Sequence, residues 1–255
     1  MGVVAVTGSA SGIGAATRTL LEDAGNTVIG VDLRNAEVIA DLATAAGRAT
    51  AIAAVLDASD GCLDGVVVCA GIGPHVDAFP TIVSLNYFGA QALLTGLRGA
   101  LAANDGGAAV AISSNSAVLP GMETPLVAAC LAGDEAEARR LAATLDGQRV
   151  YAGAKLALAR WVRRNATGAD WIGSAVRLNA VAPGAVLTPL LQGGLDHPVL
   201  GPAIQNFPIP SGGFGDADQI AAAVVFLLSE AAAFCCGSVL FVDGGTDAML
   251  RPDLF

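Results

Sequence analysis

Short runs of β-branched and aliphatic residues alternate along the chain with longer Ala- and Leu-rich segments, and this alternation constrains the fold most. We expect strands over Val3–Thr7, Thr27–Asp32, Glu37–Leu42, Gly65–Ala70, Ala108–Ser113, Ser174–Val181 and Ser238–Val242. Helices are expected over Ile13–Ala24, Val83–Leu101, Ala152–Ala166 and Asp216–Ser229. Nearly continuous apolar strands separated by helices are typical of a parallel sheet that is covered on both faces. The pattern therefore predicts an α/β fold, a doubly wound, Rossmann-like parallel sheet in a single domain over residues 1–255.

Two segments fit this pattern less well. Only Leu33–Ala36 separates the second and third expected strands, whereas a helical crossover takes about a dozen residues. Either a helix is missing there or the third strand is misplaced. Residues 118–148 contain Pro120 and Pro125 and then a helical pattern over Gly133–Leu145, so we expect an inserted helical subdomain.

Charge and cysteine content exclude several classes of protein. Thirteen basic and twenty-three acidic residues give a formal net charge of −10, so nucleic acids and anionic membranes are not expected as partners. No stretch approaches the ~20 apolar residues of a membrane helix, and the first residues run into a glycine loop rather than forming a signal peptide. The five cysteines favour reduced thiols, and no metal-ligand spacing occurs. We expect a cytoplasmic protein without a bound metal.

A glycine-rich loop, Thr7–Gly14 (TGSASGIG), joins the first strand to the first helix. Its glycines allow backbone N–H groups to approach a pyrophosphate at the positive end of the helix. Asp32 ends the second strand 18 residues after Gly14, close to the spacing of an acid that binds the adenosine ribose. A carboxylate there repels a 2′-phosphate, which favours NAD over NADP. A simple strand-end cap by Asp32, or Arg34 turned toward a phosphate, are the alternatives.

Tyr151 and Lys155 lie four residues apart in an expected helix, which places them on one face, about 5–6 Å apart at Cβ. The ordinary pKa of tyrosine is about 10, and we expect the neighbouring ammonium and the positive nicotinamide ring to lower it. Such a phenol can exchange a proton with an alcohol or carbonyl oxygen while hydride moves. Ser114, at a strand's carboxyl end, can hydrogen-bond the same oxygen; Ser113 is the alternative.

These motifs resemble those of the short-chain dehydrogenase/reductase family. They occur in the family's order over Val3–Gly245: the glycine loop, Cys69-Ala70-Gly71, Ile112-Ser113-Ser114, Tyr151–Lys155 and Pro183-Gly184. Cys69 replaces an asparagine that is usual in the family. The resemblance implies an NAD-dependent oxidoreductase whose cofactor contacts Gly8, Ser11, Gly12, Ile13, Gly14, Asp32, Leu33, Asp41, Leu42, Ala70, Gly71, Tyr151, Lys155, Pro183, Gly184, Val186 and Thr188.

The resemblance also implies the catalytic set Ser114, Tyr151, Lys155 and Asn86. Asn86 is expected to support a proton-relay water to Lys155; a buried amide bonded to backbone is the alternative. In relatives the helix that carries the tyrosine commonly forms a dimer face. Because the segment from Asn115 to Val150 is longer here than is usual, we expect a homo-oligomer, a dimer or tetramer, that pairs through the insertion or another surface.

Residues 189–215 are expected to form a lid over the substrate. The segment is rich in Leu, Gly, Pro and Ile, with Phe207 and Phe214, and an apolar lining suits a bulky hydrophobic ketone or alcohol. A mobile, nonspecific loop is the alternative. The stretches Gly30–Thr44 and Asp243–Phe255 resemble the bacterial hydroxysteroid dehydrogenases/carbonyl reductases of the family, which implies a 3-alpha-hydroxysteroid substrate.

Two other functions remain open from the sequence. A reductase of a 3-oxoacyl or xenobiotic ketone would share every motif. A cofactor-binding sensor without catalysis would be expected to lack the tyrosine or the lysine, and both are present. His75 and His197 are expected to be ordinary loop residues.

Overall fold

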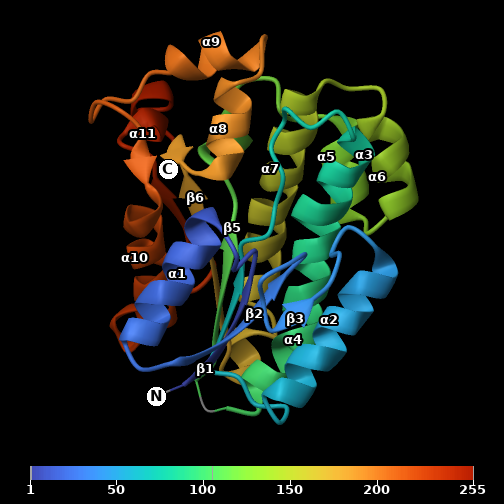
Figure 1. The fold of residues 1–255 in the computed structure, drawn as a ribbon, viewed down its shortest axis with the longest axis vertical. Helices are drawn as coiled ribbons and strands as arrows, with labels where there is room; N and C mark the ends of the chain where they lie inside the picture. The colour runs from blue at the N-terminus through green and yellow to red at the C-terminus, as the bar shows by residue number, and fades with distance from the viewer. Residues whose placement is uncertain (1, 105, 255) are drawn as a thin grey trace.

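A seven-stranded parallel sheet forms the centre of the computed structural model, which describes residues 2–104 and 106–254. Met1 and Phe255, the ends of the expected domain, lie outside the described residues, as does Asp105. The strands follow the order β3-β2-β1-β4-β5-β6-β9, with helices on both faces (Figure 1). This arrangement confirms the predicted doubly wound fold. The strands are β1 (Val3–Thr7), β2 (Thr27–Asp32), β3 (Val38–Ile39), β4 (Gly65–Val68), β5 (Ala108–Ile112), β6 (Arg177–Pro183) and β9 (Val239–Val242).

The central strands are apolar at successive positions because both of their faces are covered. β4, β5 and β6 are buried along their whole length, as parallel strands between two helical layers are. The chain builds the sheet outward from β1 in one direction, through β2 and β3, and then returns to place β4 on the other side of β1. This reversal of strand order opens a crevice at the carboxyl ends of β1 and β4, where α/β sheets bind ligands.

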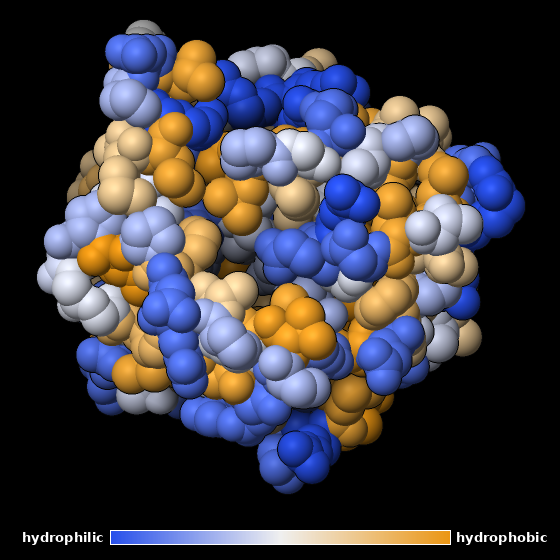
Figure 2. Space-filling view, turned by 90° about the horizontal axis from the view of Figure 1, so that it is seen from above, coloured by the Kyte–Doolittle hydropathy of each residue, from blue (hydrophilic) through white to orange (hydrophobic). Residues whose placement is uncertain are grey.

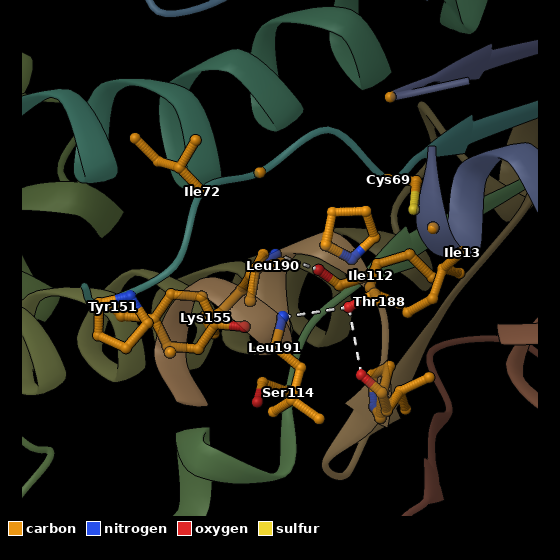
Figure 3. A pocket seen from close by; sticks show the side chains of 18 of the residues that line it. Ile13, Cys69, Ile72, Ile112, Ser114, Tyr151, Lys155, Thr188, Leu190 and Leu191 are labelled. Atoms are coloured by element: carbon orange, nitrogen blue, oxygen red, sulfur yellow. Dashed lines mark hydrogen bonds between the residues drawn. The ribbon is translucent and has the colours of Figure 1, made fainter. Parts of the chain in front are cut away.

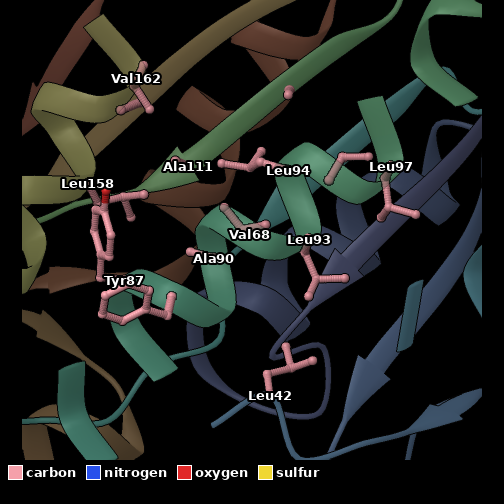
Figure 4. Close-up of a cluster of buried hydrophobic side chains, with 14 of the residues drawn as sticks. Leu42, Val68, Tyr87, Ala90, Leu93, Leu94, Leu97, Ala111, Leu158 and Val162 are labelled. Atoms are coloured by element: carbon pink, nitrogen blue, oxygen red, sulfur yellow. The ribbon is translucent and has the colours of Figure 1, made fainter. Parts of the chain in front are cut away.

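Two hydrophobic clusters hold the helices to the sheet. On one face, α1 (Gly12–Asp23) and α10 (Ala217–Leu228) pack over the strands. On the other face lie α2 (Ala45–Ala58), α4 (Ala90–Ala102) and α7 (Gly147–Ala166). Figure 4 shows leucines of α4 approaching Val68 and Ala111 of the sheet. Burying each such leucine stabilises the fold by about 1.5–3 kcal/mol.

The segment after β2 differs from the prediction. The expected strand Glu37–Leu42 is reduced to β3, which pairs directly beside β2 without an intervening helix. So short a parallel connection is possible because only two residue pairs form and because Asn35 adopts a left-handed φ of 53°. The helix that the sequence reading missed is α2, which follows β3 and begins after Thr44, whose hydroxyl accepts a hydrogen bond from Gly47 N.

The expected helix Val83–Leu101 is divided into three parts. It consists of α3 (Phe79–Val83), a π-helical turn η1 (Ser84–Gly89) and α4. π-Turns widen a helix by one residue and occur often at functional sites. This turn contains Asn86, which is completely buried.

The insertion is helical, as predicted, but it forms two helices where one was expected, and it shares the main core rather than forming a core of its own. The helices are α5 (Pro125–Leu131) and α6 (Glu135–Ala142), and Leu126, Val127 and Cys130 are completely buried in the cluster that covers the sheet. Glu135 accepts two hydrogen bonds of 2.7 Å from the buried Arg48 of α2. α5 also packs against α7.

The last third of the chain completes the sheet and covers its carboxyl edge. A 3₁₀ turn η3 (Ile172–Ser174) takes the place of the start of the expected strand Ser174–Val181. The expected lid follows β7 (Val186–Leu187) and contains α8 (Pro189–Leu195) and α9 (Leu200–Gln205); it ends where β8 (Gly215–Asp216) begins. After α10 come the turn η4 (Glu230–Ala232) and α11 (Thr246–Leu250), and a turn η2 (Asn115–Val118) opens the insertion. Among the described residues no helix has the length and apolar character to span a bilayer.

Candidate active site

A cavity of about 560 Å³ opens at the carboxyl edge of the sheet, beside the reversal of strand order. Figure 2, seen from above, shows a hollow near the middle of this face with both hydrophobic and hydrophilic residues around it. The cavity walls come from the glycine loop, the ends of β2, β4, β5 and β6, helix α7 and the lid helices α8 and α9. All of the predicted site residues line it except Gly14 and Asn86.

The glycine loop has a backbone that only small residues allow. Gly8 and Gly12 adopt left-handed φ angles of 69° and 53°, which glycine tolerates without steric cost. A Cβ on Gly14 would lie 2.1 Å from the Gly8 carbonyl oxygen, so Gly14 supports the loop from behind. The Ser11 side chain makes no capping hydrogen bond to α1. The first backbone N–H groups of α1 can therefore donate hydrogen bonds to an anion at the cavity wall.

Asp32 stands at the end of β2 with both carboxylate oxygens oriented by backbone. Its Oδ2 accepts a hydrogen bond of 3.0 Å from Ala10 N, and its Oδ1 accepts one of 2.7 Å from Leu33 N. Asp32 thus caps local backbone, which is the alternative that the sequence left open. It also lines the cavity, and Asp41 and Leu42 form the next part of the same wall. A glycine cradle followed by an oriented carboxylate fits the pyrophosphate and ribose of a dinucleotide.

Ser114, Tyr151 and Lys155 converge on the inner part of the cavity (Figure 3). Tyr151 and Lys155 lie one turn apart on α7. The Ser113 hydroxyl donates to the Lys155 carbonyl oxygen (2.9 Å) and so is committed to holding α7. The Ser114 hydroxyl lies near the Tyr151 phenol, where hydrogen bonding from it acts to lower the tyrosine pKa. This geometry favours Ser114 over Ser113 as the group that would bind a substrate oxygen.

Lys155 is the only lysine in the sequence and it is buried, with 4% of its surface exposed. Its Nζ donates a hydrogen bond of 2.7 Å to the carbonyl oxygen of Ile112 at the end of β5. Gly71 lies next to it, since a Cβ on Gly71 would be in ordinary van der Waals contact with this Nζ, at 3.6 Å. Burial lowers the pKa of Lys155 to about 8, because a buried ammonium loses its hydration.

We expected the Tyr151 pKa to be lowered, and with respect to the protein's own groups this prediction is wrong. Burial raises the pKa of Tyr151 above its ordinary value, and this effect exceeds the lowering by the Ser114 hydrogen bond. The ammonium of Lys155 is not among the groups that shift it. A four-residue spacing determines which way two side chains face, but the dielectric around them depends on how the rest of the chain buries them.

Asn86 lies behind the cavity wall and makes two hydrogen bonds to one residue. Its Oδ1 accepts from Ile72 N (3.0 Å) and its Nδ2 donates to Ile72 O (2.9 Å). A Cβ on Gly71 would lie 3.1 Å from this Oδ1, so Asn86 holds the Gly71–Ile72 segment beside Lys155. This is the backbone-bonded amide that the sequence left as an alternative; the relay water stays a prediction.

The outer part of the cavity is mostly apolar and includes residues that the sequence reading did not single out. Phe207 of the expected lid lines the cavity, whereas Phe214 does not. Thr188 begins α8 by accepting a hydrogen bond from Leu191 N (3.3 Å) and donates to Val186 O (3.2 Å). The apolar lining consists of Ile72, Pro74, Leu119, Leu190, Leu191, Leu200, Ala203, Ile204 and Phe207.

His75 is a loop residue, as expected, but it also lines the cavity. Its ring fits between two glycines: a Cβ on Gly73 would lie 2.7 Å from Nδ1, and a Cβ on Gly193 of α8 would lie 2.6 Å from Nε2. Burial is the larger of two influences that lower its pKa, and the charge of His197 is the other. No local signal could have identified this contact, because it joins the loop after β4 to the lid.

The doubly wound fold and this cavity define a class of protein, and comparison with known proteins agrees. Residues 143–247 match the family model described as enoyl-(acyl carrier protein) reductase. The chain is 31% identical to an uncharacterised short-chain type dehydrogenase/reductase of Sinorhizobium fredii, over 98% of this chain and 44% of that protein. The chain belongs to the short-chain dehydrogenase/reductase family, and it is an oxidoreductase.

Two relatives match along the whole length. The 3-alpha-hydroxysteroid dehydrogenase/carbonyl reductase of Comamonas testosteroni is 46% identical over all of both chains. The solved structure of the 3-alpha-hydroxysteroid dehydrogenase from Pseudomonas sp. B-0831, complexed with NADH, superposes with a TM-score of 0.97 at 50% identity, covering 99% of this chain and all of that one. The resemblance that the motifs predicted is therefore confirmed.

The burial of Lys155 predicts a specific pH dependence of stability. The pKa of Lys155 is lower in the folded chain than the ordinary 10.5, so the unfolded chain binds this proton more tightly. The free energy of unfolding therefore increases as pH rises from about 8 to 10.5, because the folded chain then no longer has to bury an ammonium. In Lys155→Met this gain is absent. Urea unfolding from pH 7 to 10.5 should show the variant losing on the order of 3 kcal/mol relative to the parent chain across that window. If the free energies of unfolding of the two proteins change with pH in parallel, Lys155 is not a buried ammonium.

Proposed function

We propose that this chain is an NAD-dependent oxidoreductase that interconverts a secondary alcohol and a ketone, with a 3-alpha-hydroxysteroid or another bulky hydrophobic carbonyl compound as substrate. The observation that carries the proposal is the meeting of Ser114, Tyr151 and Lys155 in a cavity that runs from the glycine loop to an apolar lid. The two full-length relatives named as 3-alpha-hydroxysteroid dehydrogenases support the substrate class.

The dinucleotide is assigned to the half of the cavity that is built from strand ends. The α1 N–H groups and the glycine loop receive the pyrophosphate, and Asp32 receives the adenosine ribose. Gly71, Pro183, Gly184, Val186 and Thr188 border the nicotinamide end. When bound, the nicotinamide supplies or accepts the hydride. The NADH complex of the Pseudomonas relative supports NAD as the cofactor.

Proton exchange is assigned to the phenol of Tyr151. In ketone reduction the phenol donates its proton to the carbonyl oxygen, and in alcohol oxidation it takes the proton back. Ser114 holds the same oxygen by a hydrogen bond, which positions the reacting carbon for hydride transfer. Lys155 would hold the nicotinamide ribose, and Asn86 keeps the Gly71–Ile72 segment in place beside it.

The apolar outer cavity suits a rigid hydrophobic substrate. Leucines of α8 and α9, with Ile204 and Phe207, form most of the lid-side wall. An apolar lining binds through burial of hydrocarbon surface, so a large ring system gains more than a sugar or a charged acid. The four-residue spacing of Tyr151 and Lys155 distinguishes this site from that of the family's enoyl reductases, in which the tyrosine and the lysine lie further apart in sequence.

Replacing Tyr151 with Phe tests the assignment of the proton donor. Tyr151→Phe should lower kcat by at least about 100-fold, the low end of the contribution of a general acid or base, while the dissociation constant of NADH stays within about twofold. Tyr87, the other tyrosine of the chain, is buried in the core, and Tyr87→Phe is the matched control with near-normal turnover. Retained activity in Tyr151→Phe would show that another group supplies the proton.

A spectrophotometric screen tests the function as a whole. The protein should oxidise androsterone-like 3-alpha-hydroxysteroids, and kcat/KM should be far higher with NAD than with NADP as the cofactor. A short 3-oxoacyl thioester and a small aromatic ketone are the comparison substrates in the reverse direction. Binding of NADH without turnover of any alcohol or ketone would identify the non-catalytic sensor instead.

We also propose that the protein is a cytoplasmic homo-oligomer that pairs along the β9 edge of the sheet. α5 covers part of α7, the helix that pairs in many relatives. Large apolar side chains are exposed on three consecutive elements at the sheet edge: Phe226 of α10, Phe234 after η4, and Leu240 of β9. An exposed apolar edge strand marks an interaction surface.

Phe234→Glu should reduce the mass measured by light scattering toward that of one chain, because a charge would be buried at the pairing surface. Ile39→Glu is the matched control, since Ile39 is also exposed but lies on β3 at the opposite edge of the sheet. An unchanged mass in Phe234→Glu, or an equal loss in both variants, would contradict pairing through β9.

A further inference from the structure

A second pocket adjoins the carboxylate of Asp32. It is lined by Ser9, Ala10, Arg18, Asn35, Ala36 and Glu37. Ala10 of this lining donates its N–H to Asp32 Oδ2, and Asp32 lines the main cavity, so this hydrogen bond connects the two sites. Because Asp32 is proposed to bind the adenosine ribose, a group attached to a ribose hydroxyl would pass Asp32 and reach this pocket. The left-handed φ of Asn35 bends the loop around its rim.

Among the described residues, Arg18 is the one cation that lines this pocket, and its guanidinium is already paired. Its Nη1 and Nη2 donate to the two carboxylate oxygens of Glu37 at 2.9 and 2.7 Å, and its Nε donates to Glu22 at 2.8 Å. A two-pronged pair of this kind is among the stronger ionic contacts in proteins. Glu37 in turn accepts a hydrogen bond of 2.8 Å from Gly30 N, so the backbone holds it over the pocket. Hydrogen bonding from Arg18 is the main cause of the lowered Glu37 pKa.

Ser9 contributes a buried hydroxyl that makes no hydrogen bond within residues 2–104 and 106–254. The residue is 3% exposed. A Cβ on Gly30 would lie 2.5 Å from this hydroxyl, 2.7 Å from Glu37 Oε2 and 3.0 Å from Arg18 Nη1, so the three polar groups gather above one glycine. A guanidinium and a hydroxyl are the donors that bind phosphate, but here a carboxylate occupies the guanidinium.

We propose that Glu37 is a specificity-determining residue that excludes the adenosine 2′-phosphate of NADP by neutralising Arg18. The inference rests on the proposed dinucleotide function and deepens it. Asp32 repels the phosphate directly. Glu37 binds both terminal nitrogens of Arg18, the cation that lines this pocket, so the guanidinium cannot compensate for that repulsion. Arg34, which the sequence suggested as a phosphate partner, lies outside the lining of this pocket.

The test measures binding of two small probes by isothermal titration calorimetry, so that no turnover is needed. The probes are adenosine 2′,5′-bisphosphate and 5′-AMP, which differ by the 2′-phosphate alone. In Glu37→Gln, which keeps the acceptor for Gly30 N, the bisphosphate should bind about tenfold more tightly, as expected for one freed charge-assisted contact. The affinity for 5′-AMP should stay within about twofold.

Glu22→Gln is the matched control, because Glu22 carries the same charge and binds the same arginine but does not line the pocket. It should leave the preference between the probes unchanged. Adding Arg18→Met to Glu37→Gln should cancel the gain, which a general reduction of negative charge would not do. Glu37→Ala repeats the measurement if the glutamine variant does not fold. In steady-state assays, Glu37→Gln should lower the ratio of kcat/KM for NAD to that for NADP by a similar factor.

Failure of this inference can be distinguished from failure of the proposed function. If the parent chain binds 5′-AMP and Glu37→Gln leaves the probe preference unchanged, the role of Glu37 is overturned and the dinucleotide site stands. Equal gains in Glu37→Gln and Glu22→Gln also overturn it, because the effect is then one of total charge. If the parent chain binds neither 5′-AMP nor NADH, the proposed function itself fails.

Discussion

The attachment of helix α7 to the end of strand β5 is the contact on which the site depends. Two hydrogen bonds meet at one residue: the Lys155 ammonium donates to the Ile112 carbonyl, and the Lys155 carbonyl accepts from the Ser113 hydroxyl. Together they fix the height of α7 above the sheet, and Tyr151 follows one turn away. Ser114 comes directly after Ser113, so the same attachment brings its hydroxyl to the phenol. A shift of α7 by one turn would separate all three groups.

Burial of this contact also determines its electrostatics. Removing Tyr151 and Lys155 from water disfavours the charged form of each, which raises the pKa of the phenol and lowers that of the amine to about 8. Charges beside the cavity therefore act in a medium of low dielectric, where they have large effects. Beyond the Asp32 end of the cavity, at a more exposed position, Glu22 and Glu37 both pair with the guanidinium of Arg18. Selection between phosphate and hydroxyl there depends on which charges are already paired.

Much of the fold could be predicted because its signals are local. The strands β1 and β2 have the predicted bounds, and most other strands end within a few residues of them. The errors lie where tertiary contacts override local pattern. β3 is limited to two residues because the chain turns back at Asn35, and the helix after Val83 is interrupted by a π-turn that buries Asn86. The insertion contributes Leu126 and Cys130 to the main core, which its polar helix pattern around Gly133–Leu145 did not indicate.

The sequence by itself determined the glycine loop, the acid at the end of β2 and the pair on α7, because turns and helical periodicity depend on neighbouring residues. It also determined the family, through the order of these motifs. Only the tertiary structure decided that Asn86 holds Ile72, that His75 lies between Gly73 and the lid, and that Glu37 pairs with Arg18. These contacts join segments whose spacing along the chain carries no distance information, and burial, which decides pKa, exists only once those segments have packed together.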